Sequence, residues 1–377
     1  MDKTRKRLTI GLVRWNADYS KQAGVTTISL SLARAWRKLG CDIVWIGSPL
    51  PLEFSSLFTY VGSEPNTHSL TQGVIHALTK YEIDLLVTFE PFIEGPAAAA
   101  VKITKDIPFA HVGMHFASHL DVSAREAEEQ TYNLADYIVY QCQWFRDNYV
   151  APKFGVDFVH SKPSLAVPFG VDTSVFIPKP LNTKRDEQQL LLFTGRLNRE
   201  NCPEPEYDKG AKYLIEALPS ILKQYHDVRV ELIGDGPQLP LLQEEVRAIN
   251  ITKNVDFLGE LKERDDILRH LQAASIFVLP SVCDIFPVAI MEAMSVGLPV
   301  VSTTVGGIPE CVDPSCGVLV EPSKSEVLAE AIVSLLSNER MRHDKGRQAR
   351  EKAVSNYDWD IAASKILLAF REYVLKR

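Results

Sequence analysis

Short apolar runs alternate with longer segments of helical periodicity along the chain. In the first half these runs predict strands at 8–13, 41–46, 85–89, 108–112 and 137–140. Between the first two, Ile28, Leu32 and Trp36 recur at four-residue spacing, which predicts a helix over 25–39. Strands that alternate with helices of this length are typical of a parallel sheet covered on both faces. The first half is therefore predicted to be an α/β, doubly wound domain.

The same alternation returns after residue 189. Strands are predicted at 190–194, 228–233, 255–258, 276–279, 299–302 and 318–320, and three helical stretches follow residue 324. Pro178, Pro180 and the alternating charges of 182–189 have the composition of a linker. We therefore expect one domain over 1–178 and a second over 188–357, with the last helix, 360–377, packing back on the first. Two such domains leave a cleft between them.

Length and charge narrow the class of protein. A chain of 377 residues exceeds what one core usually supports. With 41 Lys and Arg against 48 Asp and Glu, the net charge of −7 argues against a nucleic-acid binder. No apolar segment approaches the roughly 18 residues that span a bilayer, and the amino terminus lacks a signal peptide's apolar core. We expect a cytoplasmic protein. The basic run at 3–7 could touch an anionic membrane, but we favour a solvated, frayed terminus.

The six cysteines are scattered and include no CxxC pair. Cys311 and Cys316 could form a bridge, since only four residues separate them. In the expected cytosolic setting we predict reduced thiols that pack in the core.

The stretch 280–310 carries the strongest chemical signal. The apolar run 276–279 leads to a turn at Pro280 and Ser281, and a helix is predicted from about Phe286, with Pro287 at its first position. The turn thus lies at the carboxyl end of a parallel strand, where ligands bind, and the helix amides suit a phosphate. Glu292 lies within this apolar helix, so its carboxylate needs a hydrogen-bonding partner.

Cations and glycines follow other strands of the second half. Arg196 follows Gly195 at the end of the first strand, and Lys209-Gly210 opens the next helix after a polar insert at 198–208. Together with the amides at 287–289 these cations would hold a diphosphate without Mg²⁺, although two surface cations are the simpler alternative. Glycine turns at 234–236 and 306–307 favour a nucleotide crevice at the same edge.

Three candidates come from the first half. Gly24 marks the turn into the first helix, where the backbone could approach a ligand; it could also be a plain loop glycine. His111, His115 and His119 are spaced by four, as metal ligands on a helix would be. The adjacent Pro108 indicates instead a strand that runs into a loop, so we expect no metal site. His115, just beyond the strand, could meet a substrate or be a structural histidine.

In chain order, the motifs GRL, KG, GDGP, FLG, LPS, DIFPVAIMEAM, GLPVVST and GGIPE resemble the nucleotide-sugar-binding domain of the retaining glycosyltransferases of family 4. The segment 167–176 resembles the family's hinge, and LSLARAWRKLGCDI resembles its first helix and second strand. The resemblance spans nearly the whole chain. It implies the GT-B fold, in which two Rossmann-like domains face each other across a cleft, the first binding the acceptor and the second the donor.

The resemblance also implies a reaction and its residues. A sugar would pass from a nucleotide-diphosphate donor to a saccharide or glycolipid acceptor with retention, without cofactor or metal, and the departing phosphate would take the acceptor's proton. Arg196 and Lys209 would hold the diphosphate, Glu292 the ribose and Asp284 the donor sugar. His115 would lie beside the transferred sugar. The other implied site residues are Gly234, Leu258, Phe286, Pro287, Val288 and Ala289 for the donor, and Gly24 and His111 on the acceptor side.

Two positions depart from the family pattern. The family commonly has Glu at the position of Asp284 and Gly at that of Pro287. Asp is one methylene shorter and proline lacks an amide donor, so either the loop lies closer to the sugar or the donor differs. Asp284 could also merely complement the helix dipole. Lys209, which precedes a glycine, is preferred over Arg199 as the phosphate cation.

Two other function classes stay open: a sugar-nucleotide epimerase of the GT-B fold, and a non-catalytic GT-B subunit. The expected partners of the enzyme are a nucleotide sugar and a saccharide or lipid-linked acceptor. Peripheral contact with the inner face of the membrane is compatible with the family's frequent role in assembling surface polysaccharides and glycolipids.

Overall fold

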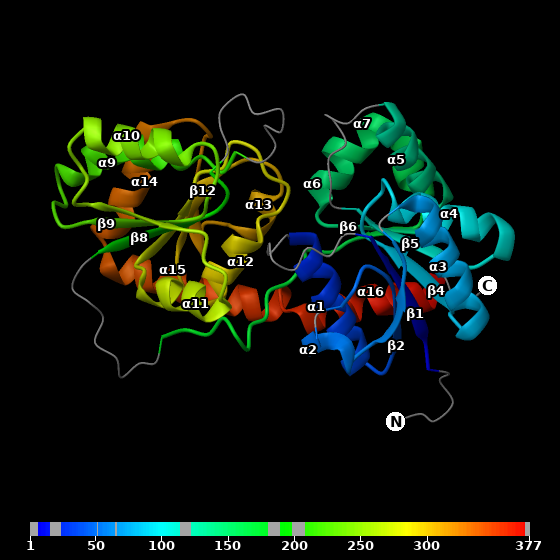
Figure 1. The fold of residues 1–377 in the computed structure, drawn as a ribbon. Coiled ribbons are helices and arrows are strands. Elements are labelled where there is room, and N and C mark those ends of the chain that lie inside the picture. Colours follow the sequence, from blue (N-terminus) through cyan, green and yellow to red (C-terminus); the bar gives the residue numbers. More distant parts are fainter. Residues whose placement is uncertain are drawn as a thin grey trace. The chain divides into compact units, whose positions relative to one another are not determined.

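The computed structural model describes residues 7–15, 24–50, 52–64, 66–113, 122–179, 189–197 and 208–373. The chain divides into two compact units, Met1–Phe169 with Trp359–Arg377, and Gly170–Asp358 (Figure 1). Each unit contains one parallel sheet.

The sheet of the first unit has seven strands in the order β3-β2-β1-β4-β5-β6-β7. Their bounds are β1 Thr9–Arg14, β2 Asp42–Gly47, β3 Thr59–Gly62, β4 Leu85–Thr88, β5 Phe109–Gly113, β6 Tyr137–Tyr140 and β7 Ser164–Ala166. All neighbouring pairs are parallel. The strand order reverses between β1 and β4. That reversal is the switch point at which open α/β sheets bind ligands.

Helices cover both faces of this sheet. They are α1 Gly24–Lys38, α2 Leu52–Ser55, α3 Thr67–Lys80, α4 Glu94–Lys105, α5 Val122–Leu134, α6 Gln143–Phe145, a π-helical turn Arg146–Val150, α7 Ala151–Phe154, α8 Val156–Ser161 and α16 Trp359–Tyr373. The C-terminal α16 packs against α1 (Figure 1). Trp36 Nε1 donates to the Ala363 carbonyl at 3.0 Å, and the Trp36 and Phe370 rings lie 5.9 Å apart. Packing therefore assigns the last helix to the first unit.

The first unit ends at Phe169, before the linker predicted from residue 178 onward. The reason is that the following residues bond to the second unit. Val171 forms a bridge with Asp358, and the Arg350 guanidinium donates to the carbonyls of Thr173 and Phe176 at 3.1 and 3.0 Å. Most of the proline- and charge-rich linker lies outside the described residues.

The second unit has six parallel strands in the order β10-β9-β8-β11-β12-β13. The strands are β8 Leu190–Thr194, β9 Arg229–Ile233, β10 Val255–Gly259, β11 Ile276–Leu279, β12 Val300–Thr303 and β13 Gly317–Val320. The helices are α9 Ala211–Leu222, α10 Leu239–Ala248, α11 Arg264–Ala273, α12 Val288–Ser295, α13 Ile308–Cys311, α14 Ser325–Leu336 and α15 Glu339–Asn356. Figure 1 shows α9, α10 and α14 on one side of the sheet and α11, α12 and α15 on the other. The prediction of two doubly wound halves is confirmed.

Local differences from the predicted elements concern edges and helix starts. β3 and β7 were not expected from the apolar pattern. Pro287 is not the first residue of α12 but its N-cap, in an extended conformation with φ −74° and ψ 117°.

Cys311 and Cys316 are buried free thiols, as are Cys41 and Cys142, whereas Cys202 lies outside the described residues. In the described part of the chain, no helix has both the length and the apolar character to cross a membrane.

Candidate functional site

Glycines bring the turns after three strands of the second sheet together. A Cβ on Gly210, whose φ is +72°, would lie 1.9 Å from the Pro280 carbonyl oxygen. A Cβ on Gly234, at φ +143°, would lie 1.9 Å from the Gly195 oxygen. No side chain fits at such distances, so these turns lie backbone against backbone. The carboxyl ends of β8, β9 and β11 therefore meet around the switch point between β8 and β11.

The contact at Gly210 can be tested with a matched glycine. Gly259 has nearly the same φ, +69°, but a Cβ there meets nothing within 4 Å. Both alanine variants carry the strain of a left-handed residue, about 1–2 kcal/mol. Gly210→Ala must also displace the Pro280 turn, so we expect it to lower the free energy of unfolding by about 1–3 kcal/mol more than Gly259→Ala. Urea denaturation measures both losses. Equal losses would mean that the two turns are not held against each other.

Lys209 lies in this group of turns and forms an ion pair with Asp284. Its Nζ lies 2.5 Å from Asp284 Oδ2, and the two side chains are 17% and 7% exposed. Ser281 Oγ donates to the same carboxylate oxygen at 3.2 Å. A Cβ on Gly195 would be 3.0 Å from Lys209 Cγ, so the lysine side chain lies along the β8 turn. The adjacent Arg196 is exposed on that turn, so two predicted phosphate cations lie at one strand end.

Asp208 is a residue of the site that sequence reasoning missed. Its Oδ1 accepts from the amide of Gly210 at 2.8 Å, and its carbonyl accepts from the amides of Val282 and Cys283 at 2.9 and 3.3 Å. These bonds join 208–210 to the turn after β11. The signal available was an aspartate directly before Lys-Gly at a helix start, which the polar insert concealed. Arg199, in that insert, lies outside the described residues.

The turn after β11 leads into the amino terminus of α12. Phe286 is buried, with its ring 6.2 Å from that of Tyr357, and this packing fixes the turn. The α12 N-terminus has no side-chain cap. The first amides of a helix have no partner within it, so those of Val288 and Ala289 are available at the positive end of the helix dipole. This is an arrangement that binds phosphate.

Glu292 lies one turn further along α12. Burial raises the pKa of its carboxyl to about 7, and the charge of Arg264 only partly opposes this. Within the described ranges no hydrogen bond reaches the carboxylate, which is half-buried. The hydrogen-bonding partner expected from the sequence is therefore not supplied by this part of the chain.

The remaining donor-side residues lie at the turns of β9 and β10. The Gly234 amide donates to the Gly259 carbonyl at 2.8 Å, which places these two turns side by side. Leu258 is half-buried at a register shift between Phe257 and Gly259. The structure thus brings the predicted donor-side positions onto one edge of one sheet.

The first-half candidates have a different outcome. His111 lies in the interior of the first unit, where its Nδ1 is 2.9 Å from Thr88 Oγ1 and its ring meets the edge of Tyr132 at 5.2 Å. It is a buried strand residue, not one exposed toward an acceptor. His115 and His119 lie outside the described residues. Gly24 is the first residue of α1, as the turn into that helix predicted.

An ion pair at the first sheet's switch point was also missed. Arg14, at the end of β1, is 1% exposed and its Nη1 lies 2.6 Å from Oε1 of the fully buried Glu94 in α4. Glu94 also accepts from the amides of Trp15, Phe89 and Glu90 at 2.8–3.1 Å. Beside it, burial raises the pKa of Glu90 to about 7. This pair joins β1 to α4 across the switch point.

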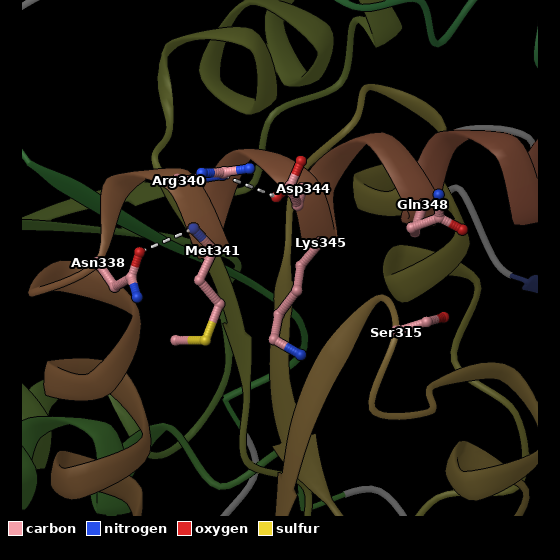
Figure 2. Close-up of a pocket in the computed structure, with 7 residues that line it drawn as sticks. All are labelled: Ser315, Asn338, Arg340, Met341, Asp344, Lys345 and Gln348. Atoms are coloured by element: carbon pink, nitrogen blue, oxygen red, sulfur yellow. Dashed lines mark hydrogen bonds and ion pairs between the residues drawn. The ribbon is translucent and has the colours of Figure 1, made fainter.

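A shallow hollow of about 380 Å³ lies elsewhere in the second unit (Figure 2). Its lining residues are Ser315, Asn338, Arg340, Met341, Asp344, Lys345 and Gln348. Asn338 Oδ1 caps α15 by accepting from the Met341 amide, and Lys345 donates to the Pro314 carbonyl. Ser315 precedes β13, so this hollow is at the amino edge of the sheet.

Over the described ranges no group of three His, Cys, Asp or Glu residues could hold a metal ion.

Known proteins resemble this chain in sequence over its second half. Residues 188–338 match the family described as glycosyl transferases group 1. A GDP-mannose-dependent phosphatidylinositol monomannoside mannosyltransferase of Corynebacterium glutamicum is 30% identical over 208 residues, 53% of this chain and 54% of that protein. A phosphatidyl-myo-inositol mannosyltransferase of Mycobacterium leprae is 29% identical over 184 residues, 48% of this chain and 46% of that protein. The chain spans about half the length of the first relatives that it matches.

Solved structures match over almost the entire chain. A glycosyltransferase from Rickettsia africae has a TM-score of 0.80 at 17% identity and covers 99% of this chain and 100% of its own. The Anabaena protein HepE, solved with UDP-glucose, has a TM-score of 0.75 at 19% identity and covers 97% of this chain and 100% of its own. Residues 188–338 are therefore similar to the glycosyl transferases group 1 family, and the chain as a whole has the GT-B fold.

Proposed function

We propose that the protein is a retaining glycosyltransferase of family 4, which moves a sugar from a nucleotide-diphosphate donor to a saccharide or glycolipid acceptor. The observation that carries this proposal is the grouping of Lys209, Arg196 and the first amides of α12 at the switch point of the second sheet. Positive side chains and unused amides at one strand edge are suited to a diphosphate.

The same groups account for catalysis without a metal. In the proposed reaction the bond between the anomeric carbon and the diphosphate oxygen breaks, and negative charge develops on that oxygen. Lys209 and the amides of Val288 and Ala289 stabilise this charge, while Glu292 accepts hydrogen bonds from the ribose. The acceptor oxygen bonds to the anomeric carbon on the face from which the phosphate departs, and the leaving phosphate takes the acceptor's proton, so the configuration is retained. Catalysis then rests on charge stabilisation and positioning.

The relatives support the substrate classes. The name of the C. glutamicum relative specifies GDP-mannose and a phosphatidylinositol glycolipid, and HepE was solved with UDP-glucose. By analogy we propose a nucleotide sugar as donor and a saccharide or lipid-linked acceptor, with the enzyme at the cytoplasmic face of a membrane.

The test is a donor screen followed by turnover. UDP-, GDP- and ADP-sugars are each mixed with the protein, and we expect one class to raise the melting temperature because it binds the native state. With a panel of saccharide and glycolipid acceptors, that donor should yield a product whose anomeric configuration, read by NMR, matches the donor's. Activity should persist in EDTA and fall about tenfold or more in Glu292→Ala.

Three results would contradict the proposal. Strict dependence on Mn²⁺ or Mg²⁺ would remove the role given to the cations and amides. Formation of an epimerised nucleotide sugar without any acceptor would indicate an epimerase. Tight nucleotide binding with no turnover over the whole acceptor panel would indicate a non-catalytic member of a larger assembly.

A further inference from the structure

We propose that Asp284 is a positioning residue for Lys209: its carboxylate holds the lysine ammonium where the donor's diphosphate binds. This rests on the proposed function. It differs from the role in donor-sugar binding that the family resemblance implies for this position. The starting observation is the contact of Lys209 Nζ with Asp284 Oδ2 at 2.5 Å, between side chains that are 17% and 7% exposed.

The backbone fixes Asp284 on one side of this contact. Gly306, at φ +55°, lies so close that a Cβ would be 1.8 Å from the Asp284 carbonyl oxygen. The next residue, Gly307, donates its amide to the Ile285 carbonyl at 2.6 Å. Ser281 Oγ holds the carboxylate itself at 3.2 Å. The carboxylate therefore has little freedom to turn elsewhere.

The backbone fixes Lys209 on the other side. Asp208 before it accepts the amides of Val282 and Cys283, and Gly210 after it lies against the Pro280 carbonyl. The two ends of the ion pair thus belong to segments that are bonded to each other. The distance between these two segments suits the length of an aspartate side chain. A side chain with one more methylene at position 284 would therefore displace the ammonium of Lys209.

The charges of Lys209 and Asp284 suit this pair to the binding of a diphosphate. An ammonium that is mostly buried needs a partner, and Asp284 supplies it. Lysine has three N–H donors, and the bond to Asp284 occupies only one of them. The others can meet phosphate oxygens while the carboxylate keeps Nζ in place. The short side chain at 284, a departure from the family's usual Glu, fits this role.

A double-mutant cycle on nucleotide affinity tests the proposal. UDP, GDP and ADP, each without a sugar, are titrated calorimetrically into the wild type, and the one that binds is used for all variants. We expect Asp284→Ala to weaken its binding about tenfold in the wild-type background and less than twofold in Lys209→Met, since the effect passes through the lysine. Asp313→Ala is the control, because Asp313 precedes the amino end of β13 and forms an ion pair with Lys352. This variant should leave the nucleotide affinity unchanged.

Asp284→Glu guards against misfolding of the alanine variant, because it keeps the charge. We expect it to weaken binding of the sugar-free nucleotide about fivefold or more, by displacing the ammonium. If Asp284 served only the donor sugar, neither variant would change affinity for a nucleotide that lacks a sugar, and that result overturns the proposal. Equal effects of Asp284→Ala in the two backgrounds also overturn the proposal. Tighter binding of the nucleotide by an Asp284 variant overturns it as well. A wild type that binds none of the three nucleotides refutes instead the proposed function.

Discussion

Replacement of Arg14 by methionine is expected to lower the free energy of unfolding of the first unit by about 3–5 kcal/mol. The methylene stem is kept, but the buried Glu94 carboxylate loses the cation 2.6 Å away. Breaking one side of a buried pair leaves a charge without compensation, which is why the expected loss is large. Urea denaturation followed by circular dichroism measures it.

Arg7→Met is the matched control in the same unit. Arg7 Nε lies 2.9 Å from Asp42 Oδ2, but the two side chains are 59% and 44% exposed. Exposed pairs contribute about 0–1 kcal/mol. Burial already raises the pKa of Glu94, and removal of Arg14 raises it further, so the penalty should be greater at pH 8 than at pH 5. Equal losses in the two variants would mean that the Arg14–Glu94 pair is not a stabilising feature of the switch point.

Replacement of Glu292 by glutamine is expected to stabilise the second unit at pH 8 by about 3 kcal/mol. The pKa of this carboxyl rises from 4.5 to about 7 on burial. Because the folded value is the higher one, its contribution to stability is complete below pH 4.5 and is lost as the pH rises through 7. Each unit of pKa is worth about 1.4 kcal/mol, which gives the expected size. At pH 5, where the carboxyl is mostly protonated in the fold, the gain should fall below about 1 kcal/mol.

The same substitution is expected to weaken sugar-nucleotide binding about tenfold or more, since hydrogen bonds to a charged group are worth about 1.5–3 kcal/mol. Stability at pH 8 and binding would then change in opposite directions, as is common for residues kept for function. Glu330→Gln, on the exposed face of α14, is the control and should change neither quantity. A Glu292→Gln protein that is destabilised at pH 8 and binds normally would show that Glu292 has only a structural role.

The sheets could be predicted from the sequence because their central strands are apolar runs. β11 and β12 are buried along their whole length and were found with nearly their observed bounds. The edge strand β3 was missed because only Val61 of its four residues is buried, and β7 is three half-buried residues long. An edge strand has a neighbour on one side only, so its pattern does not separate it from a loop.

The site could be predicted only in part. The glycine turns could be predicted because they come directly after predicted strands. The structure places Arg196, Lys209 and the α12 amides at one sheet edge, as the sequence indicated. Which side chains meet could not be foreseen, since Lys209 and Asp284 are 75 positions apart. The helix start was misjudged for a local reason: a proline suits either the N-cap or the first position, and Pro287 takes the former.

A crystal structure of the protein with the sugar nucleotide selected by the donor screen tests the central claim most directly. The account predicts diphosphate oxygens within about 3 Å of Lys209 Nζ and of an amide of Val288 or Ala289, with the ribose hydroxyls on Glu292. A diphosphate bound away from the carboxyl edge of the second sheet, with Lys209 and the α12 amides untouched, would contradict it.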